Sequence, residues 1–159
     1  RDPLQSMASW ASTLGVDNTS LEEIGLPQQI EFLDRLEGLG VKPIVISNDN
    51  LINKPEGTLR ALCEELGIEF DKAMLSWPKG CKDEDGLWAR HWYHVTWAST
   101  GFKASLRTHN NLDHRSLPPK LVAEAARGEE LFRRLKALEL RPQPILPDPR
   151  NTDIIVHVG

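Results

Sequence analysis

The sequence predicts an α/β fold in which helices outnumber strands. Most of the chain carries apolar residues three and four positions apart, the spacing of amphipathic helices. One short run, 41–47, is instead β-branched and apolar at three consecutive positions, which is typical of a strand buried in a parallel sheet. A parallel strand needs neighbours, and no comparable strand follows before the last residues. We therefore expect its partners to lie in sequence that precedes residue 1.

The first two helices follow from proline, glycine and apolar spacing. Over 3–14, Pro3 stands at a helix start and apolar residues recur on one face. Over 21–39 the same spacing continues to Gly40, where a left-handed cap is expected to end the helix. The residues between these two helices are rich in turn formers.

The middle of the chain is expected to hold a strand, a loop and a helix. The strand over 41–47 ends in a loop over 48–51. Pro55 then opens a helix with a clean apolar stripe, which ends at Gly67. This is the most regular amphipathic pattern in the sequence.

The C-terminal half combines loops with two further helices. Residues 68–87 contain proline and glycine breakers and are expected to form a loop, and 88–98 one short helix. A basic, polar link over 103–117 leads to a long amphipathic helix from about 119 to 140. Alternating prolines then favour an extended linker, so we place a domain boundary at 141–153.

Composition narrows the class of protein. With 159 residues, 40% hydrophobic and 26% charged, the chain has the size and balance of one globular domain. A net charge of −4 argues against a nucleic-acid surface, and no stretch approaches the ~20 apolar residues of a membrane span. Cys63 and Cys81 are too few for a disulfide framework or a four-ligand zinc site, which favours a reducing, intracellular compartment.

Both ends suggest a piece of a longer polypeptide. The chain opens on Arg1-Asp2-Pro3 with no Met and no signal sequence. It closes on a β-branched run, 154–159, that has no partner strand after it. We therefore expect further sequence on both sides.

The start of the first helix is the strongest candidate site. A helix N-terminus offers unpaired N–H groups and partial positive charge, and Arg1 with Ser6 and Ser9 would complete a phosphate or sulfate cradle. An ordinary cap, with Asp2 as N-cap and Arg1 in solvent, explains the same residues. Spacing alone does not choose between the two.

Aromatic residues gather in one stretch. Trp88 and Trp92 are four apart, as are Tyr93 and Trp97, so two aromatic stripes are expected on one helix. These rings could stack a purine or line a cleft, but burial in the core is the commoner role, and we expect Trp88 and Trp92 to be mostly buried. The preceding charged loop, 79–86, is either a solvated turn or a segment that closes over a ligand.

No catalytic or metal-binding residue can be assigned. His91 and His94 are three apart, but no Cys, Asp or Glu stands at a zinc-ligand spacing, so no metal site is predicted. A histidine can act as a general base, yet nothing singles out one of the five. A phosphate-binding glycine loop, a Gly-x-Ser-x-Gly elbow and a Cys-x-x-Cys pair are not found in the sequence.

Two segments resemble P-loop sulfotransferases. Arg1-Asp2-Pro3 through Ser9 is similar to the segment in which an Arg and a Ser eight residues later hold the 3'-phosphate of the sulfuryl donor, 3'-phosphoadenosine 5'-phosphosulfate. Residues 46–68 are similar to the strand, turn and helix of that fold. The resemblance implies a doubly wound parallel sheet, of which this chain is the C-terminal portion, and assigns donor binding to Arg1 and Ser9.

A narrower resemblance covers nearly the whole chain. Residues 74–80, 84–89, 92–93 and 99–102 are similar to the sulfotransferase-like domain of plant and algal branched-chain-amino-acid aminotransferase-like proteins. It implies a sulfotransferase-like domain over 1–140, the linker over 141–153, and at 154–159 the first strand of a class IV aminotransferase domain that holds pyridoxal phosphate. The compartment, cytoplasm or plastid, stays open.

Two functions follow from these resemblances. In the first, the domain transfers a sulfuryl group to a small hydroxyl or amine acceptor. In the second, it is a non-catalytic accessory or regulatory module of a pyridoxal-phosphate aminotransferase. The sequence before Arg1 would distinguish them.

Overall fold

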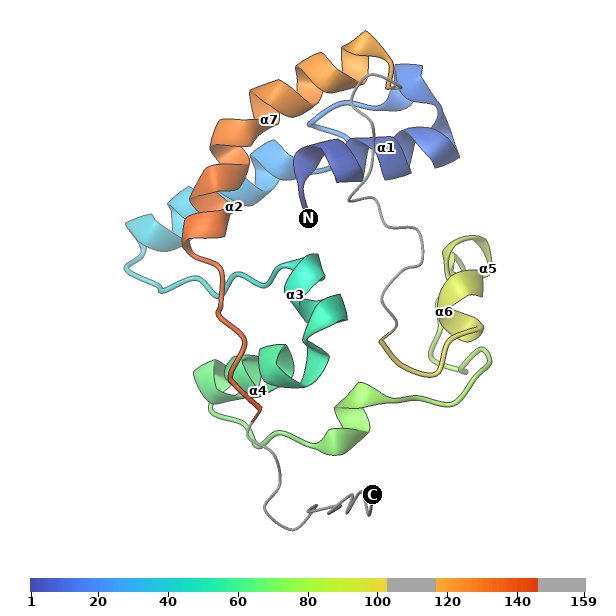
Figure 1. Ribbon diagram of the computed structural model, residues 1–159, viewed down its shortest axis with the longest axis vertical. Coiled ribbons are helices and arrows are strands. Elements are labelled where there is room, and N and C mark those ends of the chain that lie inside the picture. Colours follow the sequence, from blue (N-terminus) through green and yellow to red (C-terminus); the bar gives the residue numbers. More distant parts are fainter. Residues whose placement is uncertain (103–116, 146–159) are drawn as a thin grey trace, which may run out of the picture.

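The computed structural model describes residues 1–102 and 117–145, and most of their regular structure is helical. Figure 1 shows the arrangement, in which α7 crosses over α1 and α2 while α5 and α6 lie on the opposite side of the molecule from α2. The elements in chain order are α1 (Pro3–Leu14), η1 (Val16–Asn18), α2 (Leu26–Gly38), α3 (Asn48–Asn53), α4 (Pro55–Leu66), η2 (Lys72–Leu75), α5 (Ala89–Trp92), α6 (His94–Trp97) and α7 (Pro119–Ala137).

Proline starts and glycine ends fix two of the predicted helices. Helix α1 begins at Pro3, and the Asp2 carboxylate accepts the Gln5 backbone N–H at 3.1 Å. Helix α4 begins at Pro55 and ends at Gly67, whose φ of 66° is the left-handed conformation that glycine adopts most easily. Both predicted ranges are confirmed.

The second helix is shorter than predicted. It begins at Leu26, not at Leu21, and residues 21–25 form turns. Gly25 takes a left-handed φ of 74°, and Pro27 cannot continue a helix that starts earlier, because it has no N–H and its ring clashes with the preceding turn. Leu21 is still buried, so the apolar residue at this position indicated a place in the core and not the start of a helix.

The predicted strand is present only as an extended segment. Among the described residues, Val45 forms a single parallel bridge with Glu139, and the Leu140 N–H donates to the Val45 carbonyl at 2.7 Å. The predicted loop over 48–51 is instead the first part of α3, because the Ser47 hydroxyl accepts the Asn50 N–H and starts a helical turn.

The C-terminal half departs from prediction at two places. The helix expected over 88–98 is divided at Tyr93 into α5 and α6, each four residues long. Helix α7 begins at Pro119 as predicted but ends at Ala137. The link over 103–117 lies outside the described residues except for Leu117.

Residues 141–145, the first part of the predicted linker, pack against α4. The Gln143 N–H donates to the Gly57 carbonyl at 2.9 Å, and a Cβ on Gly57 would lie 2.4 Å from the Gln143 carbonyl oxygen. The remainder of the predicted linker, from 146, and the predicted strand over 154–159 lie outside the described residues.

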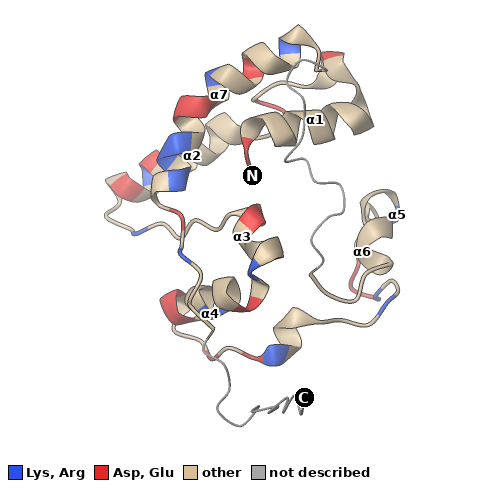
Figure 2. Cartoon of the chain, in the orientation of Figure 1, with Lys and Arg blue, Asp and Glu red and all other residues tan. Residues whose placement is uncertain are grey.

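The core lies where α7 packs on α1 and α2. Its buried apolar side chains come from α1, the turn over 21–25, α2 and α7, and they are Leu4, Met7, Leu21, Leu26, Leu121 and Ala125. Gly128 allows the close approach, because a Cβ there would lie 2.7 Å from a methyl group of Leu21. On the outside, α2 and α7 carry interspersed charges while α1 carries none (Figure 2), and Arg134 of α7 pairs with Asp34 of α2.

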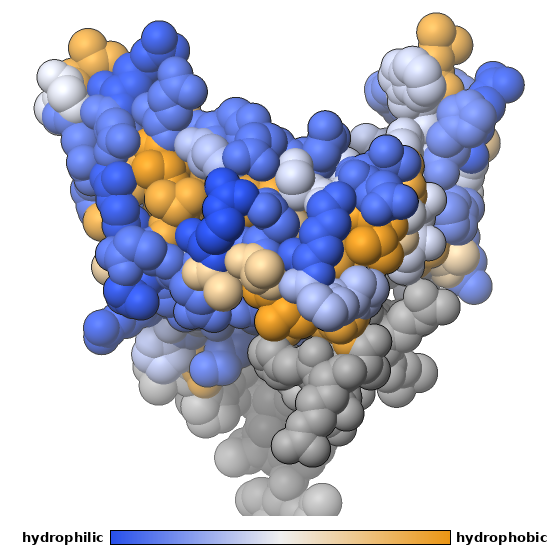
Figure 3. All heavy atoms as spheres, turned by 90° about the horizontal axis from the view of Figure 1, so that it is seen from above, coloured by the Kyte–Doolittle hydropathy of each residue, from blue (hydrophilic) through white to orange (hydrophobic). Residues whose placement is uncertain are grey.

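The surface is hollowed between two arms. Figure 3 shows this hollow from above, with apolar patches set among mostly hydrophilic atoms. Several large apolar side chains are well exposed, among them Leu39 at 72% and Leu87 at 84%. Within the described residues, no helix combines the length and the apolar character that a membrane crossing requires.

Candidate functional site

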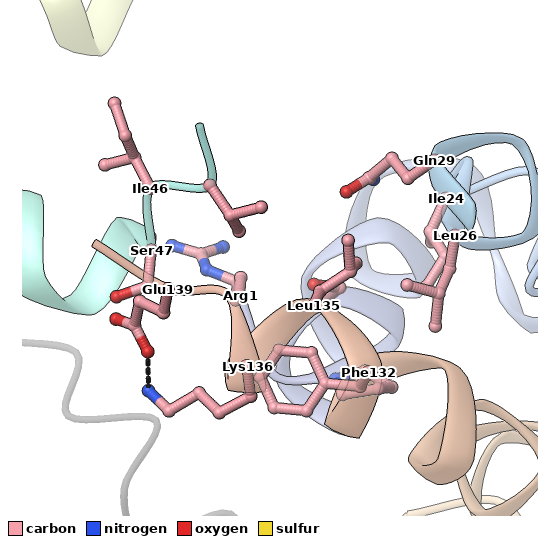
Figure 4. Close-up of a pocket in the computed structure, with 13 residues that line it drawn as sticks. Arg1, Ile24, Leu26, Gln29, Ile46, Ser47, Phe132, Leu135, Lys136 and Glu139 are labelled. Atoms are coloured by element: carbon pink, nitrogen blue, oxygen red, sulfur yellow. Dashed lines mark ion pairs between the residues drawn. The ribbon is translucent and has the colours of Figure 1, made fainter. Parts of the chain in front are cut away.

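A pocket of about 190 Å³ opens beside the start of α1. Its polar groups come from Arg1 and Ser6, from Gln29 of α2, from Ser47, and from Lys136 and Glu139 at the end of α7. Its apolar wall is made by side chains of α2, α7 and the extended segment, including Leu26, Val45, Phe132 and Leu135. Figure 4 shows the Arg1 side chain on the side of the pocket where Ser47 and Glu139 lie.

Glu139 anchors the polar side of this pocket. Its carboxylate accepts the Asn50 side-chain N–H at 2.6 Å and pairs with the Lys136 ammonium group. Burial acts to raise the pKa of Glu139, but hydrogen bonds from Lys136 and Ser47 and the Lys136 charge outweigh it, so the pKa is lowered. Glu139 is therefore ionised at neutral pH, and the Lys136 charge offsets its own.

The two predicted phosphate-binding residues occupy different positions. Arg1 is exposed and lines the pocket, whereas Ser9 does not line it. Ser9 stands one turn further along α1 than Ser6, and its carbonyl accepts the Ser12 hydroxyl at 2.7 Å. The structure thus brings Arg1 together with Ser6 in this pocket.

The start of α1 is capped from within the chain. Asp2 accepts the Gln5 N–H with its carboxylate and the Ser6 N–H with its carbonyl at 3.0 Å. The N-cap role of Asp2, one of the two sequence interpretations, is confirmed. Because Asp2 already takes up helix N–H groups, an anion in this pocket would depend on the Arg1 guanidinium more than on the helix terminus.

Four polar pocket residues were missed by sequence analysis: Gln29, Ser47, Lys136 and Glu139. Ser47 could have been found as an N-cap before Asn48, since serine commonly starts helices. Lys136 and Glu139 carry no local signal. Lys136 reaches the pocket from the last turn of α7. Glu139 reaches it because the chain after α7 returns beside Val45, a pairing between residues 94 positions apart in sequence.

The aromatic stretch does not pack as predicted. Trp88 is 74% exposed and Trp92 is 52% exposed, so the prediction that both are mostly buried is wrong. Helices α5 and α6 are too short to bury one face against a larger element, and the Trp88 ring lies 6.0 Å from that of His91. Trp77 and Trp97 are less exposed and line a second pocket with Tyr93.

The histidines do not form a metal site in the described part of the chain. There, no group of three or more His, Cys, Asp or Glu side chains is placed to hold an ion. His109 and His114 lie outside the described residues.

Comparison with known proteins identifies the class. A family model described as "Sulfotransferase domain" matches residues 1–117, and the chain belongs to this family. Membership implies a P-loop α/β fold, of which the described residues show a mostly helical part. No solved structure matches the chain.

Two particular relatives come from Arabidopsis thaliana. "Branched-chain-amino-acid aminotransferase-like protein 1" is 34% identical to this chain over 166 aligned residues, and "Branched-chain-amino-acid aminotransferase-like protein 2" is 32% identical over the same length. Each alignment covers the whole of this chain but only 29% of the relative, so the chain spans less than a third of their length.

Proposed function

We propose that this chain is the C-terminal portion of a doubly wound P-loop domain that transfers a sulfuryl group from 3'-phosphoadenosine 5'-phosphosulfate to a small hydroxyl or amine acceptor. In this proposal Arg1 binds the donor's 3'-phosphate. Ser9 is the second contact that the family resemblance implies, although Ser6 and not Ser9 lines the pocket beside Arg1. The carrying observation is that the exposed Arg1 guanidinium lines a polar pocket at the start of α1. Membership of the sulfotransferase family supports the assignment.

The pocket's size and charge suit one phosphate group. Its 190 Å³ is below the roughly 300–1,000 Å³ of sites that enclose whole small molecules. The donor's adenosine and phosphosulfate would therefore lie beyond it. Arg1 can make charge-assisted hydrogen bonds to phosphate oxygens, Ser6 can donate a further one, and the Lys136–Glu139 pair reduces repulsion by the carboxylate. The bound donor would supply the sulfuryl group.

The exposed apolar side chains of the extended segment 41–47 are evidence for the parallel sheet of this proposal. Val41 and Ile44 are exposed at 49% and 38%, although both are β-branched and apolar. Val45 lines two pockets, one that includes Arg1 and one that includes Phe32. Parallel strands from the remainder of a longer protein would cover these faces.

The relatives' names support a link to an aminotransferase-like part. We propose the domain boundaries as 1–140 for the sulfotransferase-like domain, 141–153 for the linker and 154–159 for the first aminotransferase strand. Pyridoxal phosphate would bind in that second part. An accessory or regulatory role for the sulfotransferase-like domain is the alternative, and the aminotransferase-like names of both relatives favour it.

Calorimetric titration of the full-length protein tests the phosphate site. Adenosine 3',5'-bisphosphate is expected to bind, and Arg1→Ala to weaken it by about 10- to 150-fold, since a charge-assisted contact contributes about 1.5–3 kcal/mol. Ser9→Ala is expected to weaken it by less than about tenfold. Arg35→Ala removes an exposed arginine of α2 outside the pocket and serves as the matched control.

Three outcomes distinguish the alternatives. Adenosine 5'-monophosphate, which lacks the 3'-phosphate, is expected to bind weakly and equally to the wild type and to Arg1→Ala. If the bisphosphate does not bind the wild type, the sulfuryl-donor proposal fails and the accessory role stands. Binding that Arg1→Ala leaves unchanged would show that the 3'-phosphate contacts a different residue.

A further inference from the structure

A second pocket, of about 520 Å³, lies between the loop over 76–85 and Tyr93 with helix α6. Its lining includes Trp77, Pro78, Lys82, Asp85, Tyr93 and Trp97. It shares no lining residue with the pocket at Arg1. Its volume is that of pockets that enclose a small organic molecule, which are typically about 300–1,000 Å³. We call it the aromatic groove.

Hydrogen bonds hold the walls of the aromatic groove in place. The Gly80 N–H donates to the Trp97 carbonyl at 3.0 Å, and the Trp77 N–H donates to the Thr100 carbonyl at 3.2 Å. The Trp77 indole N–H donates to the Ser99 hydroxyl at 3.0 Å, while its ring packs edge-on against Phe102 at 5.3 Å. The loop over 76–85 thus contacts Trp97 of α6 and the residues 99–102 that follow this helix, and it is not merely a solvated turn.

Asp85 is the fixed charge in this groove. The Trp97 indole N–H and the Lys82 backbone N–H donate to the same oxygen, Oδ2, at 2.7 and 2.8 Å. Among the hydrogen bonds of the described residues, Oδ1 accepts none. The Lys82 backbone bond, followed by the Trp97 bond, lowers the pKa of Asp85. The groove therefore carries an ionised carboxylate whose Oδ1 accepts no hydrogen bond from the residues that the structure describes.

We propose that the aromatic groove binds the ammonium group of a small organic amine with an aromatic or apolar body. The faces of Tyr and Trp rings attract cations, and a carboxylate held beside them adds a charge-assisted hydrogen bond. Asp85 Oδ1 takes the ammonium group, and the rings of Trp77, Tyr93 and Trp97 contact the body. This site does not depend on the sulfuryl-donor proposal.

Lys82 makes the proposal selective and testable. It lines the same groove, and its charge acts on the Asp85 carboxylate, so it competes with a bound cation. Replacement of Lys82 by an uncharged residue of similar length should strengthen binding of a cation and weaken binding of an anion. The sign of that change identifies the charge of the ligand.

Titration with matched probes tests the site in the full-length protein. The probes are 2-phenylethylammonium, the neutral 2-phenylethanol and the anion phenylacetate. We expect the ammonium probe to bind at least tenfold more tightly than the alcohol. Asp85→Asn should weaken it about fivefold or more, Tyr93→Leu should weaken it about threefold, and Lys82→Met should strengthen it.

Two controls distinguish the effect of removing the Asp85 charge from the effect of disturbing the fold. Asp85→Asn keeps a side-chain oxygen for Trp97 and Lys82, so the Trp97 indole N–H signal in NMR should stay near its wild-type position. Asp83→Asn removes a neighbouring exposed charge outside the groove lining and should leave affinity unchanged. Equal binding of amine and alcohol, preference for phenylacetate, or no binding of the ammonium probe would each overturn the proposal.

Discussion

Helix α7 and the pair α5–α6 contain the same kind of apolar spacing, but the spaced residues are buried in α7 and exposed in α5–α6. In α7, Leu121 and Ala125 are four apart and buried, against α1 and α2. In the aromatic stretch, Trp88 and Trp92 are also four apart, yet both are more than half exposed. Spacing predicts which residues share a face, but burial requires a partner for that face. Helix α7 has two partners and 19 residues, whereas α5 and α6 have four residues each.

The largest expected effect on stability comes from a substitution in the core, where α7 packs on α1 and α2. Leu121 is 1% exposed in the core between α1 and α7. Leu121→Ala should lower the free energy of unfolding by about 2–5 kcal/mol, because it removes apolar contacts and leaves a cavity. Denaturant unfolding measures this change. A loss below about 1 kcal/mol would mean that α7 is not held by this core.

A second test asks whether the segment 141–145 packs against α4. A Cβ on Gly57 would meet the Gln143 carbonyl oxygen at 2.4 Å, so Gly57→Ala should displace this segment. We expect a net loss of about 1 kcal/mol, since crowding costs about 1–3 kcal/mol and alanine recovers part of it in a helix. The segment should also become easier to cleave by protease.

Gly38→Ala is the matched control for this substitution. Gly38 lies at the end of α2, and a Cβ there meets nothing within 4 Å. It should be neutral or stabilising by up to about 1 kcal/mol. If both substitutions have the same effect, residues 141–145 do not pack on α4.

Glu139 lines the pocket and pairs with Lys136 of α7, and the pH dependence of stability tests whether these contacts stabilise the fold. Glu139→Gln should cost about 1 kcal/mol of stability at pH 7, because it weakens the contacts to Lys136 and Asn50. The folded pKa of Glu139 is below its ordinary value of 4.5, so the contribution is present above that value. The difference between wild type and variant should shrink as the pH falls through the folded pKa. A difference that grows in acid would contradict this.

The smallest effect is expected in the exposed region. Trp88→Ala should change the free energy of unfolding by about 0.5 kcal/mol or less, because the ring is 74% exposed. A buried tryptophan would cost about 3–5 kcal/mol. A loss of that size, measured by denaturant unfolding, would show that another part of the protein covers Trp88 and would end the contrast with α7.

Local signals predicted what local interactions determine. Pro3, Pro55 and Pro119 marked helix starts correctly, because a proline fixes its own backbone and lacks an N–H that the first turn does not need. The helix predicted from Leu21 failed, since Gly25 and Pro27 outweigh apolar spacing. The exposed tryptophans and the return of Glu139 to Val45 could not be predicted, because both depend on contacts between distant parts of the chain.

Only the local part of the candidate site could be predicted from the sequence. The Asp2 cap follows from three adjacent residues at a helix start and is where the sequence placed it, and Arg1 beside it lines the pocket. Phosphate binding by Arg1 stays a prediction. The polar partners across the pocket come from other elements. The choice between Ser6, which lines the pocket, and Ser9, which the family resemblance assigns, rests on side-chain positions that the sequence does not contain.

Hydrogen exchange measured with and without adenosine 3',5'-bisphosphate tests the central claim most directly, because it compares both regions in one experiment on the full-length protein. If the nucleotide binds at Arg1, we expect slower exchange at the first turns of α1, residues 2–9, and around Ser47, with no change over 87–97. Slower exchange confined to 79–97, with α1 unaffected, would contradict it, since the nucleotide would then occupy the aromatic groove and not the pocket at Arg1.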